Sequence, residues 1–499
     1  MSQSGGESMP FVFSRQLPDT QKPALLHPET GRHPGRISEF RGRGIRFRRL
    51  SGLIAAIVLI LFGGGRLHAM PHPLDEGADE SAETGQDQGQ PDEGAEGAAA
   101  VNYSEAIEKQ QQWTRDLRNM SKPLLEGDYE AEYVKIRSAY NSLLSSGGNL
   151  NSGRDLEVLQ KALELRILRA ADPAVQQDAQ LMKDVLEQVR RELARAGGAI
   201  TNAQTKQRFR QDYCREVMKV LKKLLDNNWE ARSFALSLMP DLEVVPAGFN
   251  VRRVEVFDEV PGVLLGVLTD GENQPDSIHM RAAAEISRFL RKTDSPPLEQ
   301  MKLASGLASE LQRSDTEIAY QLELVRALSH ISQPREVVGR PVPTALAALV
   351  DAMSDTQRHI LVRCEAAKGI GRAGFDAQIN FEPLAWKTVQ LSVQAGAIYN
   401  QQRNPQMEWV FSLSGADLYF AFHHEDADFK TGRNPQGMLN RAPRSQIVND
   451  AYQQVLRIAP RMWFGESIPN ADLLAVNKWV NENVPDNMTW DTNAPALQK

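Results

Sequence analysis

The segment Met280-Arg-Ala-Ala-Ala-Glu-Ile-Ser-Arg-Phe-Leu290 decides the fold, because it recurs in a similar form at other places in the chain. Three further segments resemble it, namely Trp229–Met239, Tyr320–Leu328 and Val362–Ile370. All four align at one polar position, with spacings of 49, 40 and 42 residues between Arg232, Arg281, Gln321 and Arg363. Apolar helical segments that recur at such a period indicate a repeat architecture.

Each of the last three segments is preceded by an apolar helical segment and joined to it by a polar loop. The preceding helices are predicted at Val256–Leu268, Pro297–Leu311 and Val342–Met353. Over about residues 225–400 these pairs resemble the HEAT/armadillo class of helical repeats, whose second helices carry small apolar residues. Such residues stand here at Ala283, Ala284, Ala366 and Ala367. The loop acid of that class is matched only in part, by Asp276 and Asp355.

The resemblance implies an all-α fold, a right-handed α-solenoid of HEAT-like helical hairpins in which each pair buries its apolar face against the next. An irregular helical bundle is the alternative. Residues 101–224 are expected to form a region of helical hairpins before the repeats, and residues 401–499 a C-terminal helical cap. The best strand candidate, Val251–Val256, is short. Before the repeats, helices are predicted at Tyr103–Met120 and Tyr129–Leu144, and after Asp155, Pro173 and Thr201. In the C-terminal cap, helices are predicted at Met407–His424, Ile447–Ile458 and Ala471–Val480, and the cap is expected to contain Trp463, Phe464 and Trp479.

The first hundred residues are predicted to be disordered. Residues 1–69 combine seven arginines between Arg32 and Arg49 with an apolar run of ten residues at 53–62. That order is typical of a signal peptide, and a bilayer-spanning helix needs about 20 residues. A cleaved signal, an uncleaved membrane anchor through residues 53–62 and a chance apolar run are all compatible with it. The first two predict an exported chain that is periplasmic, extracellular or membrane-anchored.

Residues 70–100 are predicted to form a disordered acidic spacer. The stretch 74–100 has nine acids and no Lys or Arg, so it cannot bury enough apolar surface to offset its ordering entropy. The whole chain has 57 bases and 64 acids, a net charge of −7. Without residues 1–69, which hold ten bases and four acids, 47 bases and 60 acids give −13. This charge argues against nucleic acid as a partner and favours a protein with a basic surface.

Two patterns could carry chemistry, and each also has a structural explanation. Gly369-Ile-Gly-Arg-Ala-Gly374 matches G-x-G-x-x-G, but it follows a predicted helix, whereas a dinucleotide site needs a preceding strand. Glycines that end a helix are the simpler interpretation. His424 and Asp428 lie four residues apart and are weak candidates for half of a metal site. A solvated helix end is the simpler interpretation there.

Other conspicuous residues are predicted to be structural. Cys214 and Cys364 are the only cysteines, and stacked repeats would hold them too far apart for a disulfide, so both are expected to be free, buried thiols. The runs Gln110-Gln-Gln-Trp113 and Lys222-Lys223 are expected to be solvated helix faces.

No catalytic residue, cofactor-binding residue or cofactor is predicted, because the sequence contains no G-x-S-x-G, P-loop or H-E-x-x-H motif. The leading hypothesis is a non-enzymatic scaffold, exported or membrane-anchored, that presents a helical-repeat surface to another protein. The alternative is an enzyme or an enzyme-maturation factor with a site in the concave face of the solenoid or in the C-terminal region.

Overall fold

The computed structural model describes residues 103–148, 150, 153–246, 254–313, 316–332, 343–374, 379–402, 404–423, 437–491 and 493–498. These residues all belong to one compact unit, Ser81–Lys499. The predicted signal or anchor in residues 1–69 and the predicted spacer at 70–100 lie outside the described residues. Within the described ranges, no helix combines the length and the apolar character that a membrane span requires.

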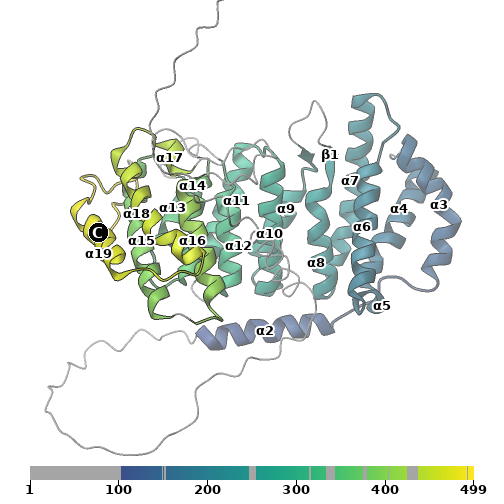
Figure 1. Cartoon of the computed structure of the whole chain (residues 1–499). Helices are drawn as coiled ribbons and strands as arrows, with labels where there is room; N and C mark the ends of the chain where they lie inside the picture. Colours follow the sequence, from purple (N-terminus) through teal and green to yellow (C-terminus); the bar gives the residue numbers. More distant parts are fainter. Residues whose placement is uncertain are drawn as a thin grey trace, which may run out of the picture. The chain divides into compact units, whose positions relative to one another are not determined.

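The described chain is mostly helical, which confirms the all-α prediction at this level. It contains 18 α-helices within the ranges given above (Figure 1). Those that precede the repeats are α2 (Tyr103–Asn119), α3 (Tyr129–Ser146), α4 (Arg154–Ile167), α5 (Pro173–Gln176), α6 (Ala179–Arg195) and α7 (Ala203–Leu224).

The starts of three of these helices differ from the predicted ones. Asp155 lies inside α4, whose N-cap residue is Gly153 and has no capping side chain. Asp178 accepts two backbone hydrogen bonds from the first turn of α6 and separates this helix from α5. Asn202, not Thr201, caps α7. Asp and Asn are strong N-cap residues, so both caps were readable in the sequence.

In the region predicted to hold repeats, about residues 225–400, helices alternate between two kinds, which we call first and second helices. The four aligned segments lie on second helices, which are α8 (Trp229–Leu238), α10 (Asp276–Lys292), α12 (Ile318–Ser329) and α14 (Ile360–Arg372). The first helices are α9 (Val260–Thr269), α11 (Pro297–Leu311) and α13 (Thr344–Ser354). Helix α9 begins four residues later than the predicted start at Val256, because Val256 belongs to a strand.

A two-stranded antiparallel sheet joins α8 to α9. Strand β1 (Glu243–Val245) follows the 3₁₀ turn Met239–Asp241 and pairs with β2 (Glu255–Val256). The predicted strand Val251–Val256 is described only from its fourth residue onward.

The C-terminal region is also helical. Its helices are α15 (Phe381–Gln401), α16 (Glu408–Phe422), α17 (Met438–Arg441), α18 (Gln446–Trp463) and α19 (Asn470–Glu482). Helix α18 packs on both α15 and α16, and α19 packs on α15. The buried indole of Trp386 donates a hydrogen bond to the carbonyl of Val480 at 2.9 Å and ties α19 to α15.

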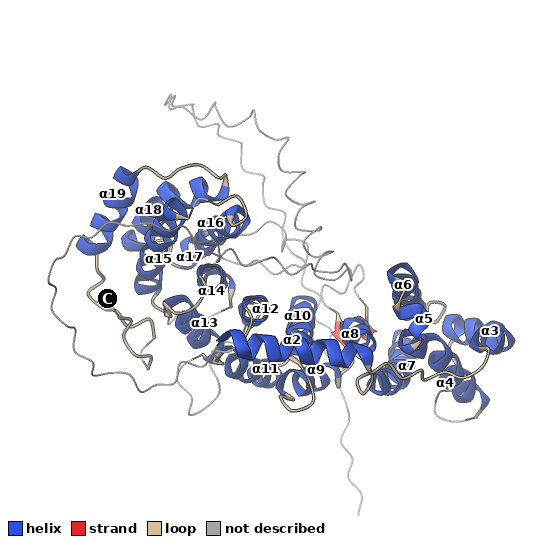
Figure 2. Ribbon diagram, turned by 90° about the horizontal axis from the view of Figure 1, so that it is seen from below, coloured by secondary structure: helices blue, strands red, loops and turns tan. Residues whose placement is uncertain are grey.

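Helices of the same kind contact one another along the chain. Each of α8, α10, α12, α14 and α16 contacts the next member of this series, which we call the second-helix row. The first helices α9, α11, α13 and α15 form a parallel series of contacts, the first-helix row. Figure 2 views many of these helices nearly end-on and shows the two rows side by side.

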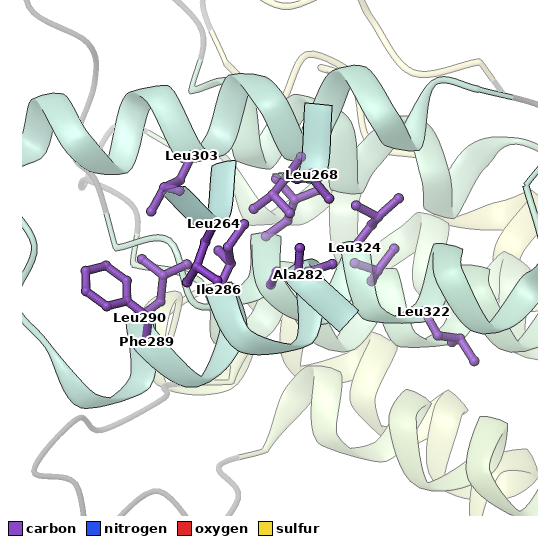
Figure 3. Packing of buried hydrophobic residues seen from close by; sticks show 14 of the residues in the cluster. Leu264, Leu268, Ala282, Ile286, Phe289, Leu290, Leu303, Leu322 and Leu324 are labelled. Atoms are coloured by element: carbon purple, nitrogen blue, oxygen red, sulfur yellow. The ribbon is translucent and has the colours of Figure 1, made fainter. Parts of the chain in front are cut away.

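The apolar core lies between the rows. Figure 3 shows part of it, with buried side chains from α9, α10, α11 and α12, among them Leu264, Leu268, Ala282, Ile286, Phe289, Leu290, Leu303 and Leu324. Burial of one Leu or Ile side chain contributes about 1.5–3 kcal/mol. Ala283 and Ala366 are fully buried, as the close packing of helices through small residues requires.

The polar residue that recurs in the repeats anchors the main chain. In three of the four second helices its side chain donates to a carbonyl of the preceding loop or helix end, which buried backbone groups need. The bonds run from Arg232 to Asn227, from Gln321 to Thr316 at 2.9 Å and from Arg363 to Met353 at 3.1 Å.

Candidate interaction surface

Three second helices share a pattern of charged residues in addition to their apolar pattern. A Glu is followed three residues later by Arg or Lys, and four residues after that by a further base or a His. The triplets are Glu285/Arg288/Lys292 on α10, Glu323/Arg326/His330 on α12 and Glu365/Lys368/Arg372 on α14. Residues with this spacing lie on one face of a helix. We call these triplets, with Asp241 and Asp417 at their ends, the charge ladder.

Ion pairs connect the charge ladder within and between helices. The pairs within helices are Glu285–Arg288 at 3.0 Å, Glu323–Arg326 at 2.6 Å and Glu365–Lys368 at 2.9 Å. Between helices, Arg326 lies 3.6 Å from Glu365, and Lys368 lies 2.8 Å from Asp417 of α16. The ladder therefore joins α12, α14 and α16 by charged contacts.

At the other end of the charge ladder, the carboxylate of Asp241 forms ion pairs with three cationic side chains from two helices. Its carboxylate lies 2.7 Å from Arg288 and 2.6 Å from Lys292 of α10, and 3.1 Å from Arg190 of α6. Burial alone would raise the pKa of Asp241, but the neighbouring cations outweigh burial and lower it. The carboxylate stays ionised and links α6 to α10.

Two carboxyl groups of opposite behaviour lie around Lys368. Burial would raise the pKa of Glu365, but Lys368 and Arg326 outweigh it and hold the pKa well below the usual range. Burial, reinforced by the charge of Glu365, raises the pKa of Asp417 to about 7, against the opposing effect of Lys368. Among the described residues, Oδ2 of Asp417 has no hydrogen-bond partner. Asp417 therefore holds its proton to a higher pH than an exposed aspartate does.

The cations of the charge ladder are more exposed than most of its carboxylates. The side chains of Arg326 and Lys292 are 39% and 29% exposed, whereas those of Glu365 and Asp417 are 4% and 7% exposed. The carboxylates thus lie beneath the cations and hold them in place. A partner that approaches this face meets pre-positioned guanidinium and ammonium groups.

Aromatic side chains gather where α16 and α18 pack against each other. We call them the aromatic patch, and its members are Tyr419, Phe420, His423, Tyr452, Trp463 and Phe464. His423 stacks on Tyr419 with ring centroids 4.7 Å apart, and Trp463 stacks on Phe464 at 5.6 Å. Phe464, predicted to belong to an apolar cap, is 60% exposed. The other five side chains of the aromatic patch are half-buried. Aromatic residues are enriched at protein interfaces.

The candidate metal ligands His424 and Asp428 lie outside the described residues, so that prediction stays untested. Among the residues that are described, no group of three or more His, Cys, Asp and Glu side chains is arranged to hold a metal ion. His423, their described neighbour, has its pKa lowered by burial.

The glycine pattern at 369–374 lies in and just after α14, in a helical contact and not in a strand-to-helix turn. Gly371 is inside the helix, where an added Cβ would collide with the backbone of Ala421 in α16. At Gly369 an added Cβ would lie 3.1 Å from Leu349 and 3.2 Å from Ser329. These glycines permit close helix packing, which corrects the expectation that they merely end the helix.

The structure confirms the predicted state of both cysteines. Cys214 and Cys364 are free and buried. Burial raises the pKa of both thiols, to about 12 at Cys214, so neither is a reactive thiolate.

The two polar runs differ from each other. Lys222 and Lys223 are about half exposed, 48% and 52%, and make surface ion pairs, which agrees with a solvated face. Gln110 departs from that expectation, because it is half-buried and accepts the N–H of Asp276. Gln111 is exposed, as expected, and also donates to Glu317. Contacts across 166 and 206 residues leave no local signal in the sequence.

Comparison with known proteins gave no match: no family model fits the sequence, and no curated protein or solved structure is significantly similar to it.

Proposed function

We propose that the protein is a non-enzymatic scaffold, exported or membrane-anchored, whose second-helix row binds another protein. The observation that carries this proposal is the aromatic patch, in which Phe464 is exposed and the other five side chains are half-buried, together with the partly exposed cations of the charge ladder. Tyr, Trp, Phe and Arg are the residues that dominate binding energy at protein interfaces.

A right-handed HEAT-like α-solenoid is the arrangement proposed for these helices. Its support is the pattern of contacts, in which second helices contact second helices and first helices contact first helices. Repeats that contact only their neighbours build an extended surface, which suits binding to a large partner.

The partner is proposed to carry a basic surface, which would face residues 74–100, and acidic groups where it meets the partly exposed cations of the charge ladder. Residues 101–499 hold 47 bases and 51 acids, a net charge of only −4, because nine of the acids counted above lie at 74–100. The acidic stretch is therefore the part of the chain that would attract a basic partner from a distance. Nucleic acid is not proposed as a partner, because the chain after residue 69 has a net charge of −13. The proposed export is based on the arginines that precede the apolar run in residues 1–69.

An enzyme or enzyme-maturation factor is the alternative, and Asp417 is the observation that favours it. A buried carboxyl group with a raised pKa and an unpartnered oxygen atom is a feature of general acids. A structural ion-pair network also shifts pKa values, and Asp417 is paired with Lys368 in this way.

Crosslinking followed by purification from native membranes tests the scaffold against the enzyme. The Phe464→Ala variant is compared with Leu474→Ala, which truncates a side chain on α19 that is 69% exposed and lies outside the aromatic patch. We expect wild type and Leu474→Ala to capture the same protein, and Phe464→Ala to capture it about tenfold less well, as for a typical hot-spot residue.

Equal capture by both variants would contradict the proposed surface. Reproducible recovery of a small ligand, with no protein captured, would replace the scaffold by the enzyme alternative.

A further inference from the structure

Helix α2 lies across the N-terminal ends of three second helices. Its residues contact the first turns of α8 and α10 and the residue that precedes α12, and Figures 1 and 2 both show α2 running across these helices. It thus touches three successive second helices at the same end.

The contacts of α2 are mostly polar. Thr114 Oγ1 lies 2.8 Å from Ser277 Oγ, which also accepts a hydrogen bond from the indole of Trp229 at 3.1 Å. The guanidinium of Arg118 lies 4.5 Å above the ring of Trp229. Gln111 donates to the carboxylate of Glu317, the N-cap residue of α12, at 3.3 Å. Side-chain contacts therefore connect α2 to all three helices.

Helix α10 obtains its N-terminal cap from α2. Its N-cap residue is Pro275, whose side chain cannot accept a hydrogen bond, and no side-chain cap is present at that position. Instead, Oε1 of Gln110 accepts the backbone N–H of Asp276 at 3.1 Å. A buried helix end needs partners for its first N–H groups, so removal of α2 would leave this donor unpaired.

The chain after α2 is fixed to the repeats at one point. The N–H of Lys122 donates to Asn227 at 3.3 Å, and the side-chain amide of Asn227 donates back to the carbonyl of Lys122 at 2.7 Å. Within α2 itself, Leu117 is the one fully buried side chain among those described. Lifting the helix about Lys122 would expose one fully buried apolar side chain, Leu117, and two large half-buried ones, Ile107 and Trp113.

We propose that α2 is a releasable strap: it caps α10 and ties the N-terminal ends of α8, α10 and α12 together, and its release loosens those ends as a group. A force or a binding event at the residues before Tyr103 would thus act on the second-helix row. That this would regulate partner binding rests on the proposed function, since the second-helix row is the proposed binding surface. That release of α2 loosens the three helix ends does not depend on the proposed function.

Hydrogen–deuterium exchange of the full-length protein tests the strap. The double variant Gln110→Ala/Thr114→Ala removes the cap and the hydroxyl contact. Gln112→Ala is the matched control, because Gln112 is exposed and its hydrogen bonds stay within α2, to Asp116 and Arg115.

In the wild type, amides of α2 are expected to exchange at least about tenfold faster than those of α8 and α12, as for a locally opening segment. In the double variant, α2 and the first turn of α10 are expected to accelerate together. Gln112→Ala is expected to leave α10 unchanged.

Two results would overturn the strap: wild-type α2 that exchanges only with global unfolding, or a double variant that accelerates α2 but leaves the first turn of α10 unchanged. The wild-type measurement keeps the proposal testable even if the double variant does not fold. No partner is needed in either measurement, so failure of the strap and failure of the proposed scaffold are distinguishable.

Discussion

At Gly371 a single missing side chain permits two helices to cross. An added Cβ would collide with the backbone of Ala421, so we expect Gly371→Ala to lower the free energy of unfolding by about 1–3 kcal/mol, as overpacking of a core does. Urea denaturation measures this change.

Gly266→Ala in α9 is the matched control, because an added Cβ there would have no atom within 4 Å. Removing a helical glycine at such a site should stabilise the protein by about 0.5–1 kcal/mol. If Gly371→Ala and Gly266→Ala had the same free energy of unfolding, the inferred close contact between α14 and α16 at Gly371 would be contradicted.

Asp417 makes stability depend on pH in a defined direction. Its pKa is raised in the folded protein, to about 7, so the native state holds a proton that the unfolded state has already released. That contribution is present at low pH and is lost as the pH rises from about 4 toward 7. Glu365, whose pKa is lowered, acts in the opposite sense, and its contribution is lost as the pH falls through the acid range.

We therefore expect Asp417→Asn to remove part of the decrease in stability between about pH 5 and 7, measured by chemical denaturation at several pH values. Asp184→Asn is the control, because Asp184 is exposed on α6 and bonds only to the neighbouring Gln180. Parallel pH profiles for wild type and Asp417→Asn would show that this carboxyl group does not titrate in that range.

Among the elements, α6 depends most plainly on its cap. Asp178 accepts hydrogen bonds from Gln180 at 2.8 Å and Leu181 at 3.1 Å, so we expect Asp178→Ala to cost about 1 kcal/mol of stability. Asp184→Ala, on the same helix but away from its end, should cost much less. Thermal or urea unfolding measures both, and equal losses would refute the capping role.

The elements show which parts of the fold were predictable from the sequence. Helix α11 begins and ends where the apolar spacing predicts, at Pro297–Leu311, because local periodicity and an N-terminal proline define it. The start of α9 was wrong because Val256 pairs with Glu243 in a sheet. Strand pairing between distant segments is not encoded in local spacing.

The candidate surface was less predictable than the helices that carry it. The spacing of Glu323 and Arg326 matches that of Glu365 and Lys368, but only the packed helices show that Arg326 also reaches Glu365 and that Lys368 reaches Asp417. The role of Gln110 was hidden for the same reason, since its partner lies 166 residues away. Contacts between helices depend on the whole fold.

At the scale of the whole molecule, nine of the described helices form two rows, and the second-helix row carries the triplets of the charge ladder and half of the aromatic patch, whose other half belongs to the neighbouring α18. The central claim is that this row is the binding surface. Exchange protection in a purified complex tests it most directly, because bound partner shields amides at the interface.

The measurement compares hydrogen–deuterium exchange of the full-length protein with and without its captured partner. We expect slower exchange in α12, α14 and α16 and over residues 452–464, with α9, α11 and α13 unchanged. Protection confined to α9, α11 and α13, or no protection in any described helix, would contradict the claim.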